Sequence, residues 1–177
     1  MSTRGAWGFI IDGEEKIAFN HYDSYPRSLG MAVKNFAQNH SLDDLKKIAK
    51  SLQLVSDDIK PTQEQINHCT EMQTVNLDVS ERSTDDWYCL LHNAQGRPEM
   101  YADGLKFMLD SRDFLKESLW CEWVYIIDLD REMFQVFKGG IVKHSGRMLY
   151  NVSLVVEIPL SGVGDIALTD IIEDSQK

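Results

Sequence analysis

The chain contains 177 residues with a net charge of −10, and 43% of its residues are hydrophobic, which is a globular composition rich enough to build a core. Its length suits one domain, and its acidic balance disfavours open-groove binding of DNA or RNA, because a negative surface repels the phosphate backbone. No apolar run approaches the ~20 residues of a membrane-spanning helix and no signal peptide is visible, so we expect a single cytoplasmic domain over residues 1–177 with no membrane contact.

A β-hairpin is predicted at the start of the chain. Residues 7–11 are aromatic and β-branched, as strand residues often are, and residues 16–19 provide the returning strand. Asp12 and Gly13 lie between the two strands, where a two-residue turn needs positive φ angles. Pro26 lacks an N–H group and therefore ends regular strand pairing.

Helices are expected in the middle of the chain. Apolar residues recur at helical spacing over residues 29–39, which predicts an amphipathic helix. Ser41 is suited to cap a second helix over residues 42–52, because Asp44 occupies the third helical position. Further helices are predicted over residues 61–72, from Trp87 to near Gly96, and over residues 104–110.

The last part of the chain returns to strands. Strand composition is clearest over residues 122–128 and 133–138, which a charged turn connects, and it recurs over residues 152–158. Strands, then helices, then strands favour an α+β fold over a regularly alternating one. We expect the N-terminal and C-terminal hairpins to share one antiparallel sheet, with the helical middle segment packed on it.

The sequence predicts no metal site and no cofactor. Cys69, Cys89 and Cys121 are scattered and odd in number, which argues against a disulfide framework or a zinc knuckle and favours buried thiols. The histidines are isolated, and no Walker loop, zinc-protease helix or nucleophile elbow occurs. Apolar neighbours favour core positions over interface positions for three tryptophans, Trp87, Trp120 and Trp123.

Polar and aromatic residues gather where the first hairpin ends, in the run NHYDSYPR at residues 20–27. Removal of the initiator methionine would leave Ser2 with a free amine, and an amine beside a hydroxyl group can accept its proton. The hairpin returns residues 20–23 to the neighbourhood of this terminus. One hypothesis is therefore a catalytic site built from Ser2, Thr3, Asn20 and Asp23, and its alternative is an ordinary N-terminal strand with a polar first turn.

The same loop has two non-catalytic interpretations. In the first, Asp23 or Ser24 caps the following helix and Tyr25 packs on the sheet. In the second, the loop and the first strand form a pocket for a small polar or anionic ligand such as a nucleotide, helped by the positive end of the helix that starts near Ser28. The ligand-binding residues would be Arg4, His21, Tyr22, Asp23, Tyr25 and Arg27.

The start Thr3-Arg4, the Asp-Gly hairpin and the run FNHYDSYPRSLG together resemble an uncharacterised family of small phage and bacterial proteins, which begin with Thr-Arg and carry a His-x-Asp-(Gly/Ser)-Tyr-Pro loop. The later run WVYIIDLDREMFQVFKGG is similar to a second hairpin of such proteins. The resemblance covers residues 1–35 and a stretch around residue 130. It implies a phage-type binding protein, located in the host cytoplasm, that sequesters a nucleotide-like host signal.

The opening also resembles N-terminal-nucleophile hydrolases of the bile-salt-hydrolase type, in which a cysteine heads the first strand and Arg-x-x-Asp ends the second. Residues 20–23 occupy the place of that motif, which implies that Asp23 is a pocket residue. Asn20 replaces the arginine, and Ser2 or Thr3 replaces the cysteine, so a cation that would stabilise an oxyanion is missing. An amidohydrolase is therefore the enzymatic alternative, and a protein-interaction module with a basic partner is the third; a homo-oligomer is compatible with each.

Overall fold

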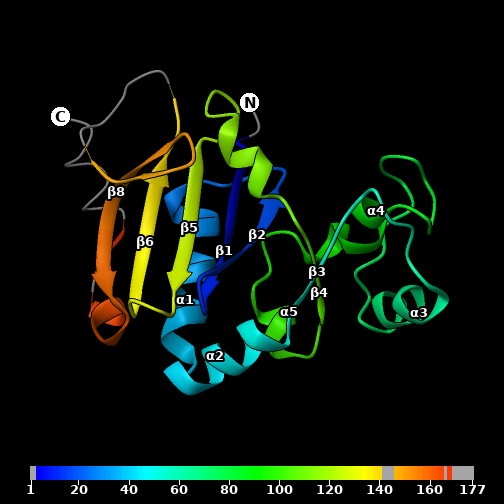
Figure 1. The fold of residues 1–177 in the computed structure, drawn as a ribbon, viewed down its shortest axis with the longest axis horizontal. Coiled ribbons are helices and arrows are strands. Elements are labelled where there is room, and N and C mark those ends of the chain that lie inside the picture. The colour runs from blue at the N-terminus through cyan, green and yellow to red at the C-terminus, as the bar shows by residue number, and fades with distance from the viewer. Residues whose placement is uncertain (1–2, 141–145, 166, 169–177) are drawn as a thin grey trace.

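A six-stranded mixed sheet forms the body of the protein in the computed structural model, which describes residues 3–140, 146–165 and 167–168 (Figure 1). The strand order is β2-β1-β5-β6-β8-β7. These strands are β1 (Gly5–Ile11), β2 (Glu14–Asn20), β5 (Trp123–Asp128), β6 (Met133–Lys138), β7 (Met148–Leu149) and β8 (Val152–Pro159). Both hairpins share one sheet, which confirms the α+β class.

The two hairpins meet through a parallel strand pair. β1 runs parallel to β5, with Trp7 opposite Tyr125, whereas the β1–β2, β5–β6, β6–β8 and β7–β8 pairs are antiparallel. The sheet is therefore mixed rather than wholly antiparallel. The long connection between β2 and β5 permits this direction, because parallel neighbours need a crossover and not a tight turn. The tight turn of the first hairpin lies at Asp12 and Gly13, whose φ angles of 52° and 75° match the prediction.

The connection between β2 and β5 contains most of the helices and a separate two-stranded parallel sheet. Ser41 caps the second α-helix as predicted, since its hydroxyl oxygen accepts the N–H of Asp44 at 3.1 Å. The helical segments are η1 (Pro26–Gly30), α1 (Met31–Asn39), α2 (Leu42–Ser51), α3 (Gln63–Glu71), α4 (Trp87–Leu91), η2 (His92–Ala94), α5 (Glu99–Ala102), η3 (Arg112–Lys116) and, after β8, η4 (Leu160–Asp165).

The helix expected over residues 104–110 is wrong. Gly104 adopts a φ of 115°, which ends the short helix α5 and is incompatible with continuing it. The chain then forms β4 (Phe107–Leu109), which pairs in parallel with β3 (Gln53–Val55). These two strands link the sheet region to the part of the molecule that carries α3 and α4 (Figure 1).

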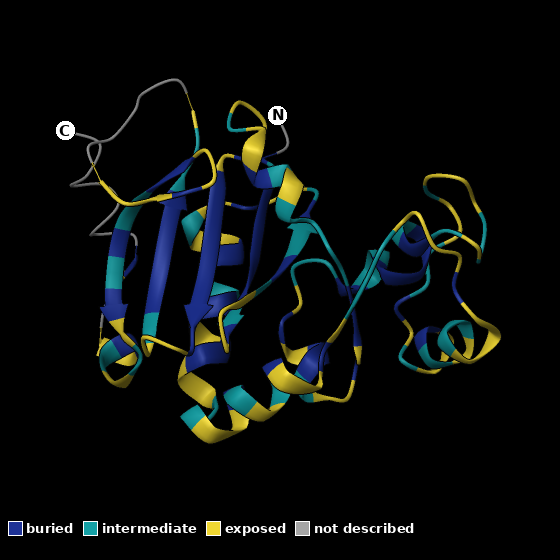
Figure 2. Ribbon diagram, in the orientation of Figure 1, coloured by how far each residue is buried: buried dark blue, intermediate teal, exposed yellow. Residues whose placement is uncertain are grey.

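Two apolar clusters lie on opposite faces of the main sheet. The larger cluster contains Tyr125 and Ile127, α1, and residues of α3 and α4, so the helical part shares one core with the sheet (Figure 2). The smaller cluster contains Val124 and Ile126 together with Leu115 of η3. This division follows from the alternation of side chains along β5.

Burial confirms the thiol prediction and corrects one tryptophan. The three cysteines are free and buried, and burial raises the pKa of Cys121 to about 12. Trp87 and Trp123 are buried, but Trp120 is 60% exposed, so the core position expected for it is wrong. In the described part of the chain, the helices lack the length and apolar character needed to span a bilayer.

Lys16 fastens α2 to the sheet. Its ammonium group is buried and donates to the C=O groups of Ala49 and Leu52, at 2.8 and 2.7 Å. Both carbonyls lie at the C-terminal end of α2, where C=O groups lack partners within the helix. The cation also lies at the negative end of the helix dipole.

We expect Lys16→Met to lower the free energy of unfolding by about 2–4 kcal/mol, because two buried carbonyl groups lose their donor. Urea unfolding measures this loss. Lys47→Met is the matched control. Lys47 belongs to α2 and its side chain is 78% exposed, so the substitution should cost less than about 0.5 kcal/mol. Equal losses of unfolding free energy in the two variants would contradict the role of Lys16 in holding α2 on the sheet.

Candidate functional site

The candidate site begins with the loop from Asn20 to Tyr25, called here the 20–25 loop. The side-chain amide of Asn20 donates to the C=O of Tyr22 and, at 2.8 Å, to the hydroxyl of Ser24. The N–H of Ser24 donates to the C=O of Thr3 at 3.1 Å. Thr3, Asn20 and Ser24 are all buried, so the structure brings the start of the first strand and the end of the second together.

Tyr125 supports the 20–25 loop from the sheet. Its hydroxyl donates to the C=O of Ser24 at 2.9 Å, and burial raises its pKa, so the hydroxyl keeps its proton for this bond. Gly30 makes room for the ring, because a Cβ at that position would lie 2.7 Å from Tyr125 Cε1. The backbone of the loop is therefore held by Tyr125 of β5 as well as by hydrogen bonds within the loop.

Four of the predicted ligand-binding residues project from this fixed loop or just after it. Tyr22 is 54% exposed and Tyr25 is 42% exposed, and Asp23 and Arg27 are exposed as well. Asp23 has a φ of 56°, a left-handed conformation that aspartate tolerates better than most residues. Tyr25 faces solvent, so the expectation that it packs on the sheet is wrong.

The start of η1 differs from the predicted side-chain cap. No side chain caps it; the C=O of Asp23 accepts the N–H of Leu29, and the C=O of Tyr25 accepts those of Ser28 and Gly30. Because these N–H groups already have acceptors, the start of this helix offers an anion less than the sequence suggested.

Arg4 and His21 lie beside the loop with other partners. The guanidinium group of Arg4 lies over the ring of Trp120, 5.7 Å from its centroid. The His21 ring has edge-on contacts with Phe19 and Tyr22, each at a centroid distance of 6.0 Å. The structure thus places His21 next to Tyr22, while it pairs Arg4 with the exposed Trp120.

The catalytic hypothesis receives little geometric support. Ser2 lies outside the described residues. Both hydrogens of the Asn20 amide are engaged inside the loop, which leaves no N–H of that side chain to stabilise an oxyanion. Thr3 and Asp23 remain candidates by position alone.

A pocket that sequence reasoning missed adjoins the loop at the edge of β2. Its lining comes from β1 and β2, from α4, η2 and α5, and from β4 and the segment after it, and it encloses about 30 Å³. Gln95 connects it to the loop, because its side-chain oxygen accepts the N–H of His21 at 2.8 Å. This β2-edge pocket is lined by Trp7, Ala18, Phe19, Tyr88, Leu91, Ala94, Gln95, Tyr101, Leu109 and Ser111. Gln95 is far from the loop in sequence and belongs to no motif, so no sequence signal could have found it.

His92 lies next to Tyr88, which lines this pocket. Its ring contacts that of Tyr88 at a centroid distance of 5.2 Å, and its Nδ1 atom is buried without a hydrogen-bond partner among the described residues. Burial lowers the pKa of His92, and the nearby His21 lowers it further. His92 is therefore neutral at pH 7.

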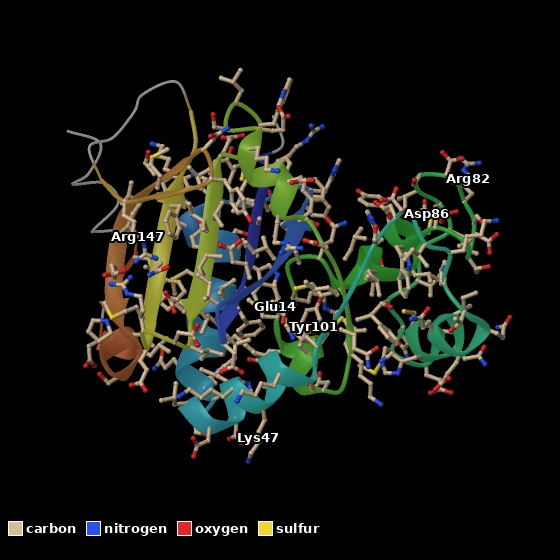
Figure 3. The ribbon with its side chains drawn as sticks, viewed as in Figure 1. Glu14, Lys47, Arg82, Asp86, Tyr101 and Arg147 are labelled. Atoms are coloured by element: carbon tan, nitrogen blue, oxygen red, sulfur yellow. The ribbon has the colours of Figure 1, made fainter. Side chains whose placement is uncertain are left out.

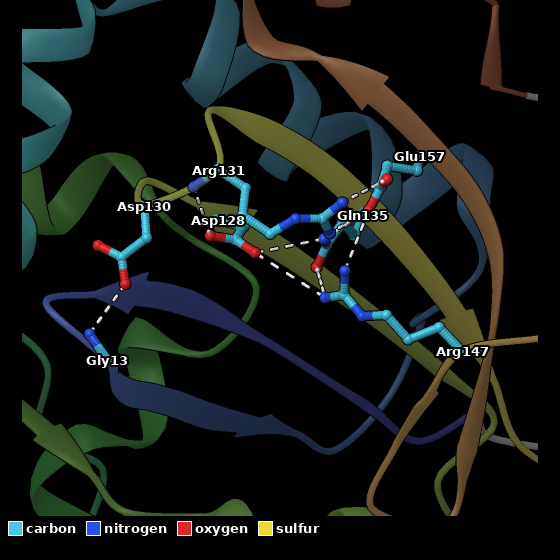
Figure 4. A network of polar contacts seen from close by, with 7 residues as sticks. All are labelled: Gly13, Asp128, Asp130, Arg131, Gln135, Arg147 and Glu157. Carbon is cyan, nitrogen blue, oxygen red and sulfur yellow. Dashed lines mark hydrogen bonds and ion pairs between the residues drawn. The ribbon is translucent and has the colours of Figure 1, made fainter.

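A second polar cluster lies at the other end of β5 (Figure 4). The Gln135 amide donates to Asp128 at 3.3 Å and to Glu157 at 2.8 Å, and Arg131 donates twice to Glu157, at 2.6 and 3.0 Å. Arg147 lies 3.4 Å from Glu157 and 3.9 Å from Asp128. Because each charge has an opposite partner, this cluster stabilises the sheet rather than presenting free charge to a ligand.

The turn beside this cluster holds the first hairpin. The two carboxylate oxygens of Asp130 accept the N–H groups of Asp12 and Gly13, each at 2.8 Å. Figure 4 shows the bond to Gly13. The charged segment at residues 129–132 is thus a turn, as predicted, and it binds a neighbouring turn.

Acidic residues gather away from the sheet, near α4, where Figure 3 labels Asp86. They line a hollow together with Tyr88, and the pKa of Asp57 is raised there by burial and then by the charges of Asp86 and Asp58. Among the residues that the structure describes, no three His, Cys, Asp or Glu side chains are arranged to hold a metal ion.

A groove of about 560 Å³ lies between the end of α1 and η4. Two of the charged residues that line it have partners: His40 bonds Glu99 at 2.8 Å, and Glu132 lies 3.8 Å from Lys46. The exposed aromatic residues of the described chain lie elsewhere.

Comparison with known proteins finds no match, since no family model, no curated protein and no solved structure is significantly similar to this chain.

We expect Tyr125→Phe to lower the free energy of unfolding by about 1–3 kcal/mol, because the buried C=O of Ser24 loses its donor. Tyr25→Phe is the matched control, since that side chain is exposed and its hydroxyl should contribute nothing measurable. Urea unfolding compares the two. An unchanged midpoint for Tyr125→Phe would show that the loop does not depend on this bond.

The low pKa of His92 makes stability depend on pH. Its pKa in the folded protein lies below the ordinary value of 6.5, so the unfolded chain binds the proton first as the pH falls. The free energy of unfolding should therefore decrease from about pH 6.5 down to the folded pKa. We expect His92→Gln to weaken this decrease, measured by urea unfolding at about pH 7.5 and about pH 5.5. An identical decrease in both proteins would contradict the assignment.

Proposed function

We propose that this protein binds a small, nucleotide-like ligand on the 20–25 loop. The single observation that carries the proposal is the contrast within that loop. Its backbone is fixed by the buried bonds of Asn20, Ser24 and Tyr125, while Tyr22 and Tyr25 project into solvent. Large aromatic side chains on a fixed loop bind a ligand with little loss of conformational entropy.

The chemistry of the exposed side chains fits such a ligand. A tyrosine ring offers a stacking face for a planar base, as aromatic side chains do in single-strand nucleic-acid binding. Arg27 can donate a forked pair of hydrogen bonds to a phosphate group. Asp23 can accept hydrogen bonds from sugar hydroxyls or a base amino group. These groups are close in sequence, and each of them is exposed.

The resemblance to phage proteins suggests the biological setting of the proposal. A chain that only sequesters a host signal needs a binding site and no catalytic group. The engaged amide of Asn20 agrees with binding rather than with turnover. The amidohydrolase and the protein-interaction module stay predictions without a supporting contact.

The test is ligand-induced stabilisation with a panel of mono-, di- and cyclic nucleotides. A ligand present at ~100 times its Kd should add about 2.7 kcal/mol to the free energy of unfolding. We expect the double variant Tyr22→Ala/Tyr25→Ala to lose this stabilisation, because the stacking faces are removed.

Tyr150→Ala is the control, since Tyr150 is also exposed but bonds Glu15 at the far end of β2. It should keep the stabilisation in full. No stabilisation of the wild-type protein by any nucleotide, or full stabilisation of the double variant, would overturn the proposed function.

A further inference from the structure

The backbone of Phe19 faces the β2-edge pocket. In a hairpin closed by a two-residue turn, the pair Ile11 and Glu14 is hydrogen-bonded, and bonded pairs then alternate along the ladder. Lys16, Ala18 and Asn20 therefore point their N–H and C=O groups toward β1. Ile17, Phe19 and His21 point theirs outward, away from the sheet.

Neighbouring segments occupy two of the three outward positions. The N–H of Ser111 donates to the C=O of Ile17 at 2.9 Å. The N–H of His21 donates to the Gln95 side chain at 2.8 Å. Phe19 lies between them and lines the pocket, so its N–H and C=O groups are offered there side by side.

Aromatic and small residues enclose these two backbone groups. Tyr88, Tyr101 and Ala94 contribute to the apolar lining, and Gln95 and Ser111 contribute polar groups to it. The His92 ring contacts that of Tyr88, and its buried Nδ1 atom has no hydrogen-bond partner among the described residues. The site thus combines apolar walls with a few convergent polar groups, which is the usual composition of a small-molecule pocket.

We propose that the β2-edge pocket recognises the hydrogen-bonding edge of a nucleobase, with the N–H of Phe19 donating to the base and the C=O of Phe19 accepting from it. This inference rests on the proposed function and names the part of the ligand that gives specificity. Every nucleobase carries an acceptor next to a donor on its pairing edge, which is the complement of one strand residue's N–H and C=O. The volume of about 30 Å³ has room only for the hydrogen-bonding atoms of that edge, so the rest of the ring, the sugar and the phosphate lie outside it, on the side of His21 and the 20–25 loop.

The contact path from pocket to loop is continuous. Gln95 lines the pocket and bonds His21, and the His21 ring contacts that of Tyr22. Gln95 and His21 therefore connect the pocket to the exposed Tyr22 through direct contacts.

The experiment uses the wild-type protein and isothermal titration calorimetry. Each of the four ribonucleoside 5′-monophosphates is compared with an analogue methylated on its pairing edge, for example N6,N6-dimethyladenosine monophosphate against adenosine monophosphate. We expect at least one parent nucleotide to bind and its methylated analogue to bind about tenfold or more weakly, because the backbone pair of Phe19 is then left unmatched.

A filled pocket gives a second measurement. Ala94→Leu places a larger side chain in the pocket wall and should weaken binding of the parent nucleotide about tenfold, whereas Ala32→Leu on α1 should leave it unchanged. Circular dichroism shows whether each variant is folded. If Ala94→Leu does not fold, the methylated analogues decide alone.

The outcomes separate this inference from the proposed function. Equal binding of parent and methylated nucleotides, abolished by Tyr22→Ala/Tyr25→Ala, would keep the proposed function and overturn the base-edge pocket. No binding of any parent nucleotide would overturn the base-edge pocket, and no stabilisation by any nucleotide of the mono-, di- and cyclic panel would overturn the proposed function as well.

Discussion

The parallel pairing of β1 with β5 is the constraint on which the rest of the structure depends. It places β5 along the whole first hairpin, so that both ends of this hairpin are held from the same strand or from its adjoining turn. At one end Tyr125 bonds the C=O of Ser24, and at the other Asp130 bonds the N–H groups of Asp12 and Gly13. A hairpin alone is only marginally stable in water, so this double attachment is what makes the 20–25 loop a fixed feature.

Fixing the loop separates the roles of its residues. Asn20 and Ser24 use their side chains inside the protein, and replacing them would disturb the backbone before it affected any ligand. Tyr22, Asp23 and Tyr25 have the opposite position, since their side chains are exposed and contribute little to the core. The loop thus contains two kinds of residue: buried polar residues that hold its backbone, and exposed residues that include two tyrosines.

Local patterns could be predicted from the sequence, and distant contacts could not. The Asp12-Gly13 turn, the Ser41 cap and the strands of the second hairpin depend on neighbouring residues, whose preferences are visible in the sequence. The direction of β1 against β5 depends on the path of the whole helical segment, which no local pattern encodes. The β2-edge pocket is of the second kind, because it joins residues of β2 to Gln95 and Ser111, far along the chain.

The position of the pocket also follows from the way the protein protects an edge strand. An uncovered edge invites pairing with another chain, and natural proteins cover or interrupt it. Here Ser111 covers the edge at Ile17, and the Gln95 side chain covers it at His21. The single residue left between them is too short a stretch to add a strand, but it is long enough to present one donor and one acceptor. The same covering of the strand edge therefore leaves the outward-facing N–H and C=O groups of Phe19 between two occupied positions.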